Sequence, residues 1–216
     1  VACADIDREA AATTAALVEA EGPSAHVLTA DVSDVDACAR VVAAADEAMG
    51  GIDGLVCNVG IGAGRGLGGT TSEQWDTVFA VNARSHFLLA AAALPRMPDG
   101  GSIVFISSVA GLTAGSRIPA YDASKAALTG LCRQVAAEGA RRGVRANVVA
   151  PGLIDTPLGR WATGGRPSRA KAPVPLGRQG TAWEVAEPVV FLLSDKASYI
   201  TSQLLAVDGG LTGCRG

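Results

Sequence analysis

Tyr121 and Lys125 are the residues of this sequence whose types and spacing best suit catalysis. They are four positions apart in a segment of helical composition, so we expect them on one helix face, roughly 6 Å apart at Cβ. A phenol pKa near ~10 is too high for a base at neutral pH. An ammonium group at about 5 Å, in an effective dielectric of ~20, contributes on the order of 3 kcal/mol and lowers that pKa by about two units. The pair is a candidate for general acid–base catalysis, or it is only a surface pair of a kind common at this spacing.

Ser108 is the candidate partner of this pair. It follows the apolar run 103–106, which predicts a strand, and therefore lies at a strand's carboxyl end, where open α/β sheets bind ligands. Its hydroxyl could hydrogen-bond a substrate oxygen as charge develops there.

Strands and helices must alternate to position these residues. Apolar runs predict strands at 1–4, 26–30, 52–59, 103–106, 144–150 and 204–207, and helical patterns cover 8–21, 35–49, a segment capped at 71–74, 121–140 and 182–193. The helix at 35–49 is expected to begin with a capping box at Ser33. The alternation predicts one α/β domain over 1–216, with a doubly wound parallel sheet and helices on both faces.

Composition excludes several classes of protein. Hydrophobic residues make up 49% of the 216, which excludes global disorder, and the net charge of −3 gives no basic face for nucleic acid. The longest apolar run, 87–94, is too short for a membrane span, and no signal peptide is recognisable at the start. Five widely spaced cysteines indicate neither a zinc nor a disulfide framework, which favours a cytoplasmic protein.

Two aspartates at predicted strand ends are candidate nucleotide-binding residues. Asp5 could accept hydrogen bonds from both hydroxyls of an adenosine ribose and would repel a 2′-phosphate, which favours NAD over NADP. Asp5 or Asp7 could equally cap the following helix. Asp31 could bond an adenine amino group or, with Ser33, cap the next helix. The glycine-rich segment 58–69 could bring its backbone close to a ligand or be a flexible linker.

These motifs, in this order, resemble the short-chain dehydrogenase/reductase family over essentially the whole chain. Ser107-Ser108-Val109-Ala110-Gly111 followed by Tyr121-Asp122-Ala123-Ser124-Lys125 resembles its active site, and Asn82 resembles the asparagine that completes its catalytic tetrad. The further matches are Asp5, Asp31-Val32, Cys57-Asn58-Val59-Gly60 (two of four residues departing from Asn-Asn-Ala-Gly), Pro151-Gly152 and Val207-Asp208-Gly209-Gly210.

The resemblance implies a Rossmann-like fold and specific roles. Tyr121 would exchange a proton with an alcohol or carbonyl oxygen that Ser108 orients and polarises. Lys125 would lower the Tyr121 pKa and bind the nicotinamide ribose. Asn82 would hold a water that continues a proton relay from Lys125, or would make only a helix-to-loop hydrogen bond. The residues expected at NAD are Asp5, Ile6, Asp31, Val32, Asn58, Val59, Gly60, Tyr121, Lys125, Pro151, Gly152, Ile154 and Thr156, the last two at the carboxamide.

The chain departs from the family pattern at its start. The family begins with a strand and a Thr-Gly-x-x-x-Gly-x-Gly turn whose N–H groups hold the pyrophosphate, and nothing before Asp5 supplies them. That strand is central in the family's sheet, so we expect unpaired backbone on both neighbouring strands. The sequence, which starts with Val, could be an incomplete form of an ordinary enzyme, or the protein could bind cofactor poorly or not at all.

The leading hypothesis is NAD(H)-dependent interconversion of a secondary alcohol and a ketone. A 3-oxoacyl thioester reductase is a variant favoured by a basic stretch in the region of the family's substrate lid, which could also be a solvated loop; its residues are Arg160, Arg166, Arg169, Lys171 and Arg178. The Tyr-x-x-x-Lys spacing argues against an enoyl reductase. A non-catalytic nucleotide-sensing or scaffold relative would explain a genuinely missing phosphate loop. The family usually assembles through helices like that near Tyr121, so we expect a homo-oligomer, a tetramer.

Overall fold

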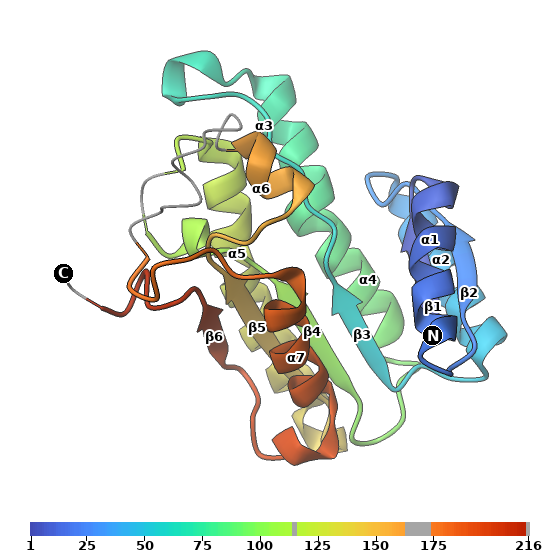
Figure 1. Ribbon diagram of the computed structural model, residues 1–216. Helices are drawn as coiled ribbons and strands as arrows, with labels where there is room; N and C mark the ends of the chain where they lie inside the picture. The colour runs from blue at the N-terminus through green and yellow to red at the C-terminus, as the bar shows by residue number, and fades with distance from the viewer. Residues whose placement is uncertain (114–115, 163–173, 215–216) are drawn as a thin grey trace.

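The computed structural model of the chain describes residues 1–113, 116–162 and 174–214, and strands alternate with helices along it (Figure 1). The strands are β1 (Ala2–Asp5), β2 (His26–Thr29), β3 (Gly54–Cys57), β4 (Ser102–Ile106), β5 (Arg145–Pro151) and β6 (Leu204–Val207). The helices are α1 (Arg8–Ala20), α2 (Val35–Met49), α3 (Ser72–Phe79), α4 (Ser85–Ala93), α5 (Pro119–Gly139), α6 (Pro157–Ala162) and α7 (Ala182–Leu193). The predicted strand 52–59 is the least accurate, because only its middle four residues are extended in a sheet.

The described strands form two parallel sheets and not one continuous sheet. β1 pairs with β2, and the larger sheet has the order β3-β4-β5-β6. β1 and β3 are not hydrogen-bonded to each other, so each has one unpaired edge among the described strands, as expected from the family pattern. The prediction of a parallel α/β fold with helices on both faces is confirmed, and the division into two sheets is the detail that differs.

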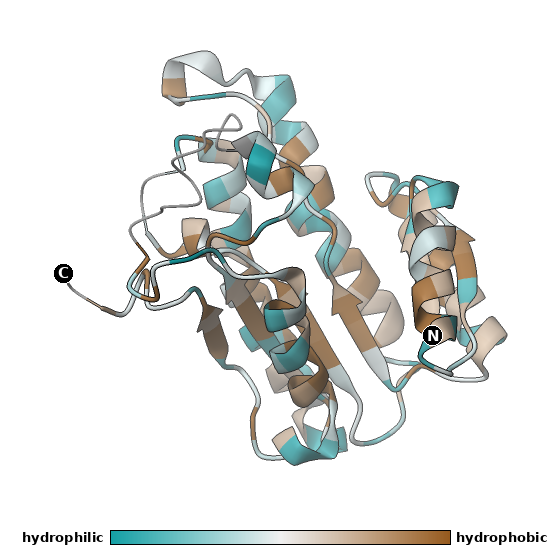
Figure 2. Cartoon of the chain, viewed as in Figure 1, coloured by the Kyte–Doolittle hydropathy of each residue, from teal (hydrophilic) through white to brown (hydrophobic). Residues whose placement is uncertain are grey.

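The central strands explain why both faces of the larger sheet are covered. All five residues of β4 are buried, and alternate side chains enter different cores. Ile103 and Phe105 belong to the core formed with α2, α4 and α5, whereas Val104 and Ile106 pack with α7 on the other face. Figure 2 shows this as apolar strands between helices whose outer surfaces are more polar. Such continuously apolar strands are typical of a parallel sheet that is buried on both sides.

Helix packing joins the two sheets. Cys38, Val41 and Val42 of α2 share the main core with Leu89 and Ala93 of α4, while Leu28 of β2 packs against the same cluster. The β1–β2 unit is therefore attached through side chains, not through a strand ladder. No helix of the described residues is long and apolar enough to cross a membrane.

Candidate active site

The carboxyl ends of β3, β4, β5 and β6 meet at one edge of the larger sheet because these strands are parallel. The first turns of α5 lie at this edge, where β4 ends at Ile106 and α5 begins at Pro119 (Figure 1). Proline suits the first position of a helix, because that position needs no backbone donor and proline's fixed φ is helical. The candidate catalytic residues therefore lie where β4 ends and α5 begins, at the same edge of the sheet.

Tyr121 and Lys125 lie on the same face of α5, as their spacing predicts. The ammonium nitrogen of Lys125 is 5.8 Å from the centre of the Tyr121 ring. Ser108 lies just beyond β4, and its hydroxyl forms a hydrogen bond with Tyr121 that lowers the tyrosine's pKa. The Ser108 oxygen also accepts a 3.1 Å hydrogen bond from the Ala110 amide, which fixes its orientation. The fold thus brings these three side chains into one site.

The pKa of Tyr121 differs from the sequence-based expectation. Burial raises this pKa above its ordinary value and outweighs the hydrogen bond from Ser108, while the Asp122 carboxylate raises it further. A lowering by Lys125 is not among the causes in this structure, so the expected net decrease was wrong. Burial dominates because it disfavours the phenolate whatever the nearby charges are.

Lys125 is a buried cation with two donors to spare. It is 2% exposed, and burial lowers its pKa to about 8. Its Nζ atom donates a 2.8 Å hydrogen bond to the Ile106 carbonyl at the end of β4. A Cβ atom on Gly60 would lie 2.9 Å from this nitrogen, so the absence of a side chain there leaves room for the ammonium group. An ammonium has three N–H donors, and the two that make no hydrogen bond to the described residues remain for a ligand.

Asn82 is fully buried in a one-turn π-helix, Ala80–Arg84, between α3 and α4. Its Oδ1 atom accepts from the Ile61 amide at 2.9 Å, and Nδ2 donates to the Ile61 carbonyl at 2.9 Å and to the Ser124 hydroxyl at 3.0 Å. The structure therefore contains the helix-to-loop bond that was the alternative reading of this residue. Both amide donors are used, so a relay water could be held only by acceptor atoms of Asn82.

Two serines that sequence reasoning did not single out hold α5 in place. The Ser107 hydroxyl donates a 2.7 Å hydrogen bond to the Lys125 carbonyl, and Ser124 donates a 2.8 Å bond to the Tyr121 carbonyl. Both serines are buried. Their positions inside the matched motifs, directly before Ser108 and Lys125, were the only sequence signal for them.

His86 is a third residue near the site that the sequence analysis did not identify. Its ring is fully buried, and burial together with the nearby Lys125 charge lowers its pKa to about 3. A neutral ring must donate through Nε2 to the Val59 carbonyl, 3.1 Å away. Its Nδ1 atom has no partner among the described residues. His86 therefore supports the loop after β3.

The aspartates predicted at the adenosine end lie in local turns with free acceptor capacity. Asp7, not Asp5, caps α1, and Asp5 uses one oxygen to accept a 3.0 Å bond from the Asp7 amide. Asp34 caps α2 in place of the expected capping box at Ser33, because its carboxylate accepts from the Asp36 amide at 2.9 Å. Asp31 accepts from the Ser33 amide at 2.9 Å and is exposed.

Other predicted cofactor residues lie at strand ends of the same fold. Ile6 is 65% exposed after β1, Val32 packs against the main core, and Asn58 is exposed after β3. Gly152 follows β5, and a Cβ atom there would lie 2.7 Å from the Asp208 backbone, which explains the glycine after Pro151.

The segment after Gly152 turns into α6. Ile154 forms an isolated parallel bridge with Gly180, and the Thr156 hydroxyl accepts a 3.1 Å bond from the Gly159 amide. The Thr156 oxygen is thus engaged in local structure at the start of α6.

The residues present fit a dinucleotide along the carboxyl edge. Gly60 and Gly152 leave space where a side chain would intrude, and Lys125 has two spare donors. One carboxylate oxygen of Asp5 accepts no hydrogen bond within the described part of the chain. No cluster of metal-binding side chains exists in the described part of the chain.

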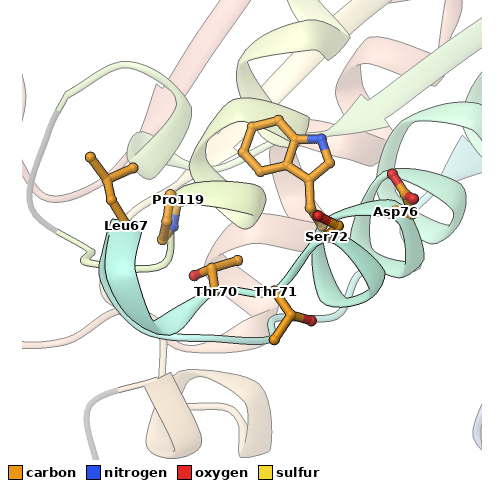
Figure 3. Close-up of a pocket in the computed structure, with 7 residues that line it drawn as sticks. Leu67, Thr70, Thr71, Ser72, Asp76 and Pro119 are labelled. Atoms are coloured by element: carbon orange, nitrogen blue, oxygen red, sulfur yellow. The ribbon is translucent and has the colours of Figure 1, made fainter.

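Two hollows flank the glycine-rich loop. The first, about 290 Å³, is lined by residues that include Trp75 of α3. Figure 3 labels Leu67, Thr70 and Pro119 among its other lining residues. The second, about 220 Å³, is lined by Gly64, Arg65, Ile118 and Trp161. Thr70, which lines the first hollow, donates a 2.9 Å hydrogen bond from its hydroxyl to the Gly66 carbonyl.

Comparison with known proteins adds to this geometry. Residues 1–212 match the family described as Enoyl-(Acyl carrier protein) reductase. The chain is 41% identical over 215 residues to inactive 2-(S)-hydroxypropyl-CoM dehydrogenase 2 of Xanthobacter autotrophicus, covering 96% of this chain and 93% of that protein. It is 39% identical over 197 residues to the 3-oxoacyl-(acyl-carrier-protein) reductase FabG of Thermotoga maritima, covering 89% and 80%.

A solved structure has a similar fold. The blue fluorescent protein from a metagenomic library, crystallised in complex with NADPH, superposes with a TM-score of 0.90 at 35% identity. The match covers 98% of this chain and 87% of that protein.

Proposed function

The chain belongs to the short-chain dehydrogenase/reductase family of oxidoreductases, which use nicotinamide cofactors, and from that membership we propose that it interconverts a secondary alcohol and a ketone with NAD(H). The observation that carries this proposal is the contact of Tyr121 with the Ser108 hydroxyl, beside the buried ammonium group of Lys125. Such a phenol–hydroxyl pair can act on the same substrate oxygen.

In the proposed reaction Tyr121 is the general acid or base. Its phenol gives a proton to the carbonyl oxygen during reduction and takes it back from the alcohol during oxidation. Ser108 donates a hydrogen bond to that oxygen and stabilises the charge that develops on it. The bound nicotinamide supplies the hydride chemistry.

Lys125 has two proposed tasks. Its two spare donors bind the nicotinamide ribose, and its ammonium group, 5.8 Å from the centre of the Tyr121 ring, starts the proton relay that leads away from the tyrosine. Because its pKa is about 8, the side chain carries its positive charge at neutral pH. A relay water at the remaining acceptors of Asn82 would continue the proton path.

The preference for NAD over NADP rests on Asp5. A carboxylate at the end of β1 suits ribose hydroxyls and repels a 2′-phosphate. The structural neighbour named above was crystallised with NADPH, so cofactor choice is a direct test of the Asp5 argument. The other proposed contacts are Ile6, Asp31, Val32, Asn58, Val59, Gly60, Pro151, Gly152, Ile154 and Thr156.

The experiment is oxidation of a panel of secondary alcohols with NAD and with NADP by the protein and by Tyr121→Phe. We expect activity with NAD and a rate about 10²-fold or more lower in the variant, whose ring packs as before. An equal rate in the variant would remove Tyr121 from its role, and a preference for NADP would refute the Asp5 argument.

A 3-oxoacyl thioester reductase is the second candidate within the family. The similarity to a 3-oxoacyl-(acyl-carrier-protein) reductase favours it. The basic stretch supports it less than expected, because Arg160 pairs with Asp155 and Arg178 with Glu184, both at 2.6 Å. Arg166, Arg169 and Lys171 lie outside the described residues. Reduction of an acetoacetyl thioester faster than any simple ketone would establish this candidate.

A non-catalytic relative is the candidate from another class. One close match carries the word inactive in its name, which favours testing this possibility directly. Titration with NADH and with NADPH, monitored by nucleotide fluorescence, distinguishes the enzyme from the non-catalytic relative. Nucleotide binding without turnover of any alcohol would indicate a sensing role, and no binding would refute the cofactor proposal.

We further propose a homo-oligomer, a tetramer, in the cytoplasm. Large apolar side chains are exposed on the helices that flank the sheet, including Phe87 of α4 and Trp183 and Val190 of α7. All five cysteines are free, as suits a reducing compartment. Light scattering that gives the mass of one chain would contradict the assembly.

A further inference from the structure

The pocket of about 220 Å³ beside the glycine-rich loop lies between the residue that precedes α5, Ile118, and Trp161 of α6. A Cβ atom on Gly62 would lie 2.8 Å from the Trp161 ring and 3.8 Å from Ile118, so the indole packs directly on this loop. Ile118 is three residues before Tyr121, and Asn82 fixes Ile61, the neighbour of Gly62, through both its backbone groups. The pocket is therefore held against the elements that carry Tyr121 and Lys125.

Arg65 brings a positive charge to this pocket. Its guanidinium forms no salt bridge within the described part of the protein, in contrast to Arg160 and Arg178. The four described residues that line the pocket include no acidic side chain. The positive charge of Arg65 thus makes the pocket complementary to an anion, and its other described walls are apolar.

The backbone around the pocket is held in an unusual conformation. Arg117 has a φ of +64°, a left-handed geometry that residues with a side chain adopt infrequently, and its carbonyl accepts a 2.8 Å hydrogen bond from the Gly66 amide. This bond joins the segment that ends in Arg65 to the segment that continues into Ile118. Strained residues of this kind cluster at ligand-binding sites.

We propose that this pocket receives an anionic group of the substrate, a carboxylate or a similar oxyanion, bound by Arg65. The inference rests on the proposed function, because the oxygen handled by Tyr121 and Ser108 belongs to the same substrate. The planar guanidinium donates paired hydrogen bonds to an oxyanion. Trp161 and Ile118 cover the short carbon chain between the anion and the reacting carbon, so the substrate class is a hydroxy or oxo acid.

The test uses two ketones that differ in charge, acetoacetate and methyl acetoacetate. Binding of each is followed by tryptophan fluorescence of the protein, with Trp161→Phe to assign the signal. We expect acetoacetate to bind about tenfold or more tightly than the ester. Arg65→Gln should weaken acetoacetate binding about tenfold or more and leave ester binding within about twofold, whereas Arg65→Lys should retain part of the preference. Arg141→Gln, an exposed arginine after α5 at the opposite end of β5, is the matched control and should change neither.

The outcomes separate this inference from the proposed function. Equal losses for both ketones in Arg65→Gln, no loss for acetoacetate, or no saturable acetoacetate binding would overturn the anion pocket. A loss of NADH binding in Arg65→Gln with unchanged acetoacetate binding would assign the pocket to the cofactor and overturn it too. Reduction of the ester by the protein would sustain the proposed function in each of these cases. Selective acetoacetate binding without reduction of either ketone would support the pocket and count against the dehydrogenase.

Discussion

A side chain on Gly60 would collide with the ammonium group of Lys125, because its Cβ atom would lie 2.9 Å from Nζ and 3.3 Å from Cε. The loop after β3 and the second turn of α5 thus fit together at a single glycine. The ammonium group is the flexible end of a side chain and can move away. The contact therefore bears on function more than on stability.

Gly60→Ala is expected to lower kcat/KM about tenfold or more, because the added methyl group displaces the Lys125 ammonium from the Ile106 carbonyl. The free energy of unfolding should change by less than about 1 kcal/mol, as measured by urea denaturation. Gly69→Ala in the same loop is the control, since no atom lies within 4 Å of its Cβ position. Equal activities of the two variants would contradict the role of this contact.

The depressed pKa of Lys125 predicts that stability increases in alkali. The unfolded lysine has a pKa of 10.5 and the folded one about 8, so between these values the unfolded chain binds more protons. The free energy of unfolding should therefore gain about 2 kcal/mol from about pH 7 to about pH 9.5 through this group. Urea denaturation of the protein and of Lys125→Met at both pH values measures the difference. A pH dependence that is the same in both proteins would show that Lys125 does not titrate in this range.

The buried neutral His86 predicts a loss of stability in acid. Its pKa is about 3 in the folded protein against 6.5 in the unfolded chain, so the unfolded chain takes up the proton first as the pH falls. The free energy of unfolding should decrease by about 2 kcal/mol between about pH 7 and about pH 5. His86→Gln keeps a donor for the Val59 carbonyl and should remove this decrease. An undiminished decrease in the variant would assign the acid sensitivity to other groups.

Asn82→Ala should destabilise the protein by about 2–4 kcal/mol. The change leaves the amide and carbonyl of Ile61 and the Ser124 hydroxyl without their buried partner. Asn82→Asp is the informative comparison, because an aspartate can still accept from the Ile61 amide but cannot donate to its carbonyl. Thermal unfolding should rank the original protein above both variants. A variant that melts like the original would show that the loop after β3 does not depend on Asn82.

Local patterns predicted most elements, because a helix face or a buried strand imposes its own spacing on the sequence. Tyr121 and Lys125 share a face of α5 for this reason, and the apolar run 103–106 of β4 was recognisable without any knowledge of its neighbours. The order of the motifs along the chain was enough to identify the family. Capping was less predictable, since Ser33, Asp34 and Asp36 lie within four positions and each can accept from a free helix amide.

Contacts between segments that are distant in the sequence could not be predicted from local patterns. Three contacts depend on how separate elements pack. Ser108 contacts Tyr121, Asn82 forms hydrogen bonds with Ile61, and Trp161 packs against the loop beside Arg65. Packing also reversed the expected direction of the Tyr121 pKa, because burial acts on a charge through everything that surrounds it. Sequence spacing specifies which side chains share an element, whereas desolvation and encounters across elements arise only when the chain is folded.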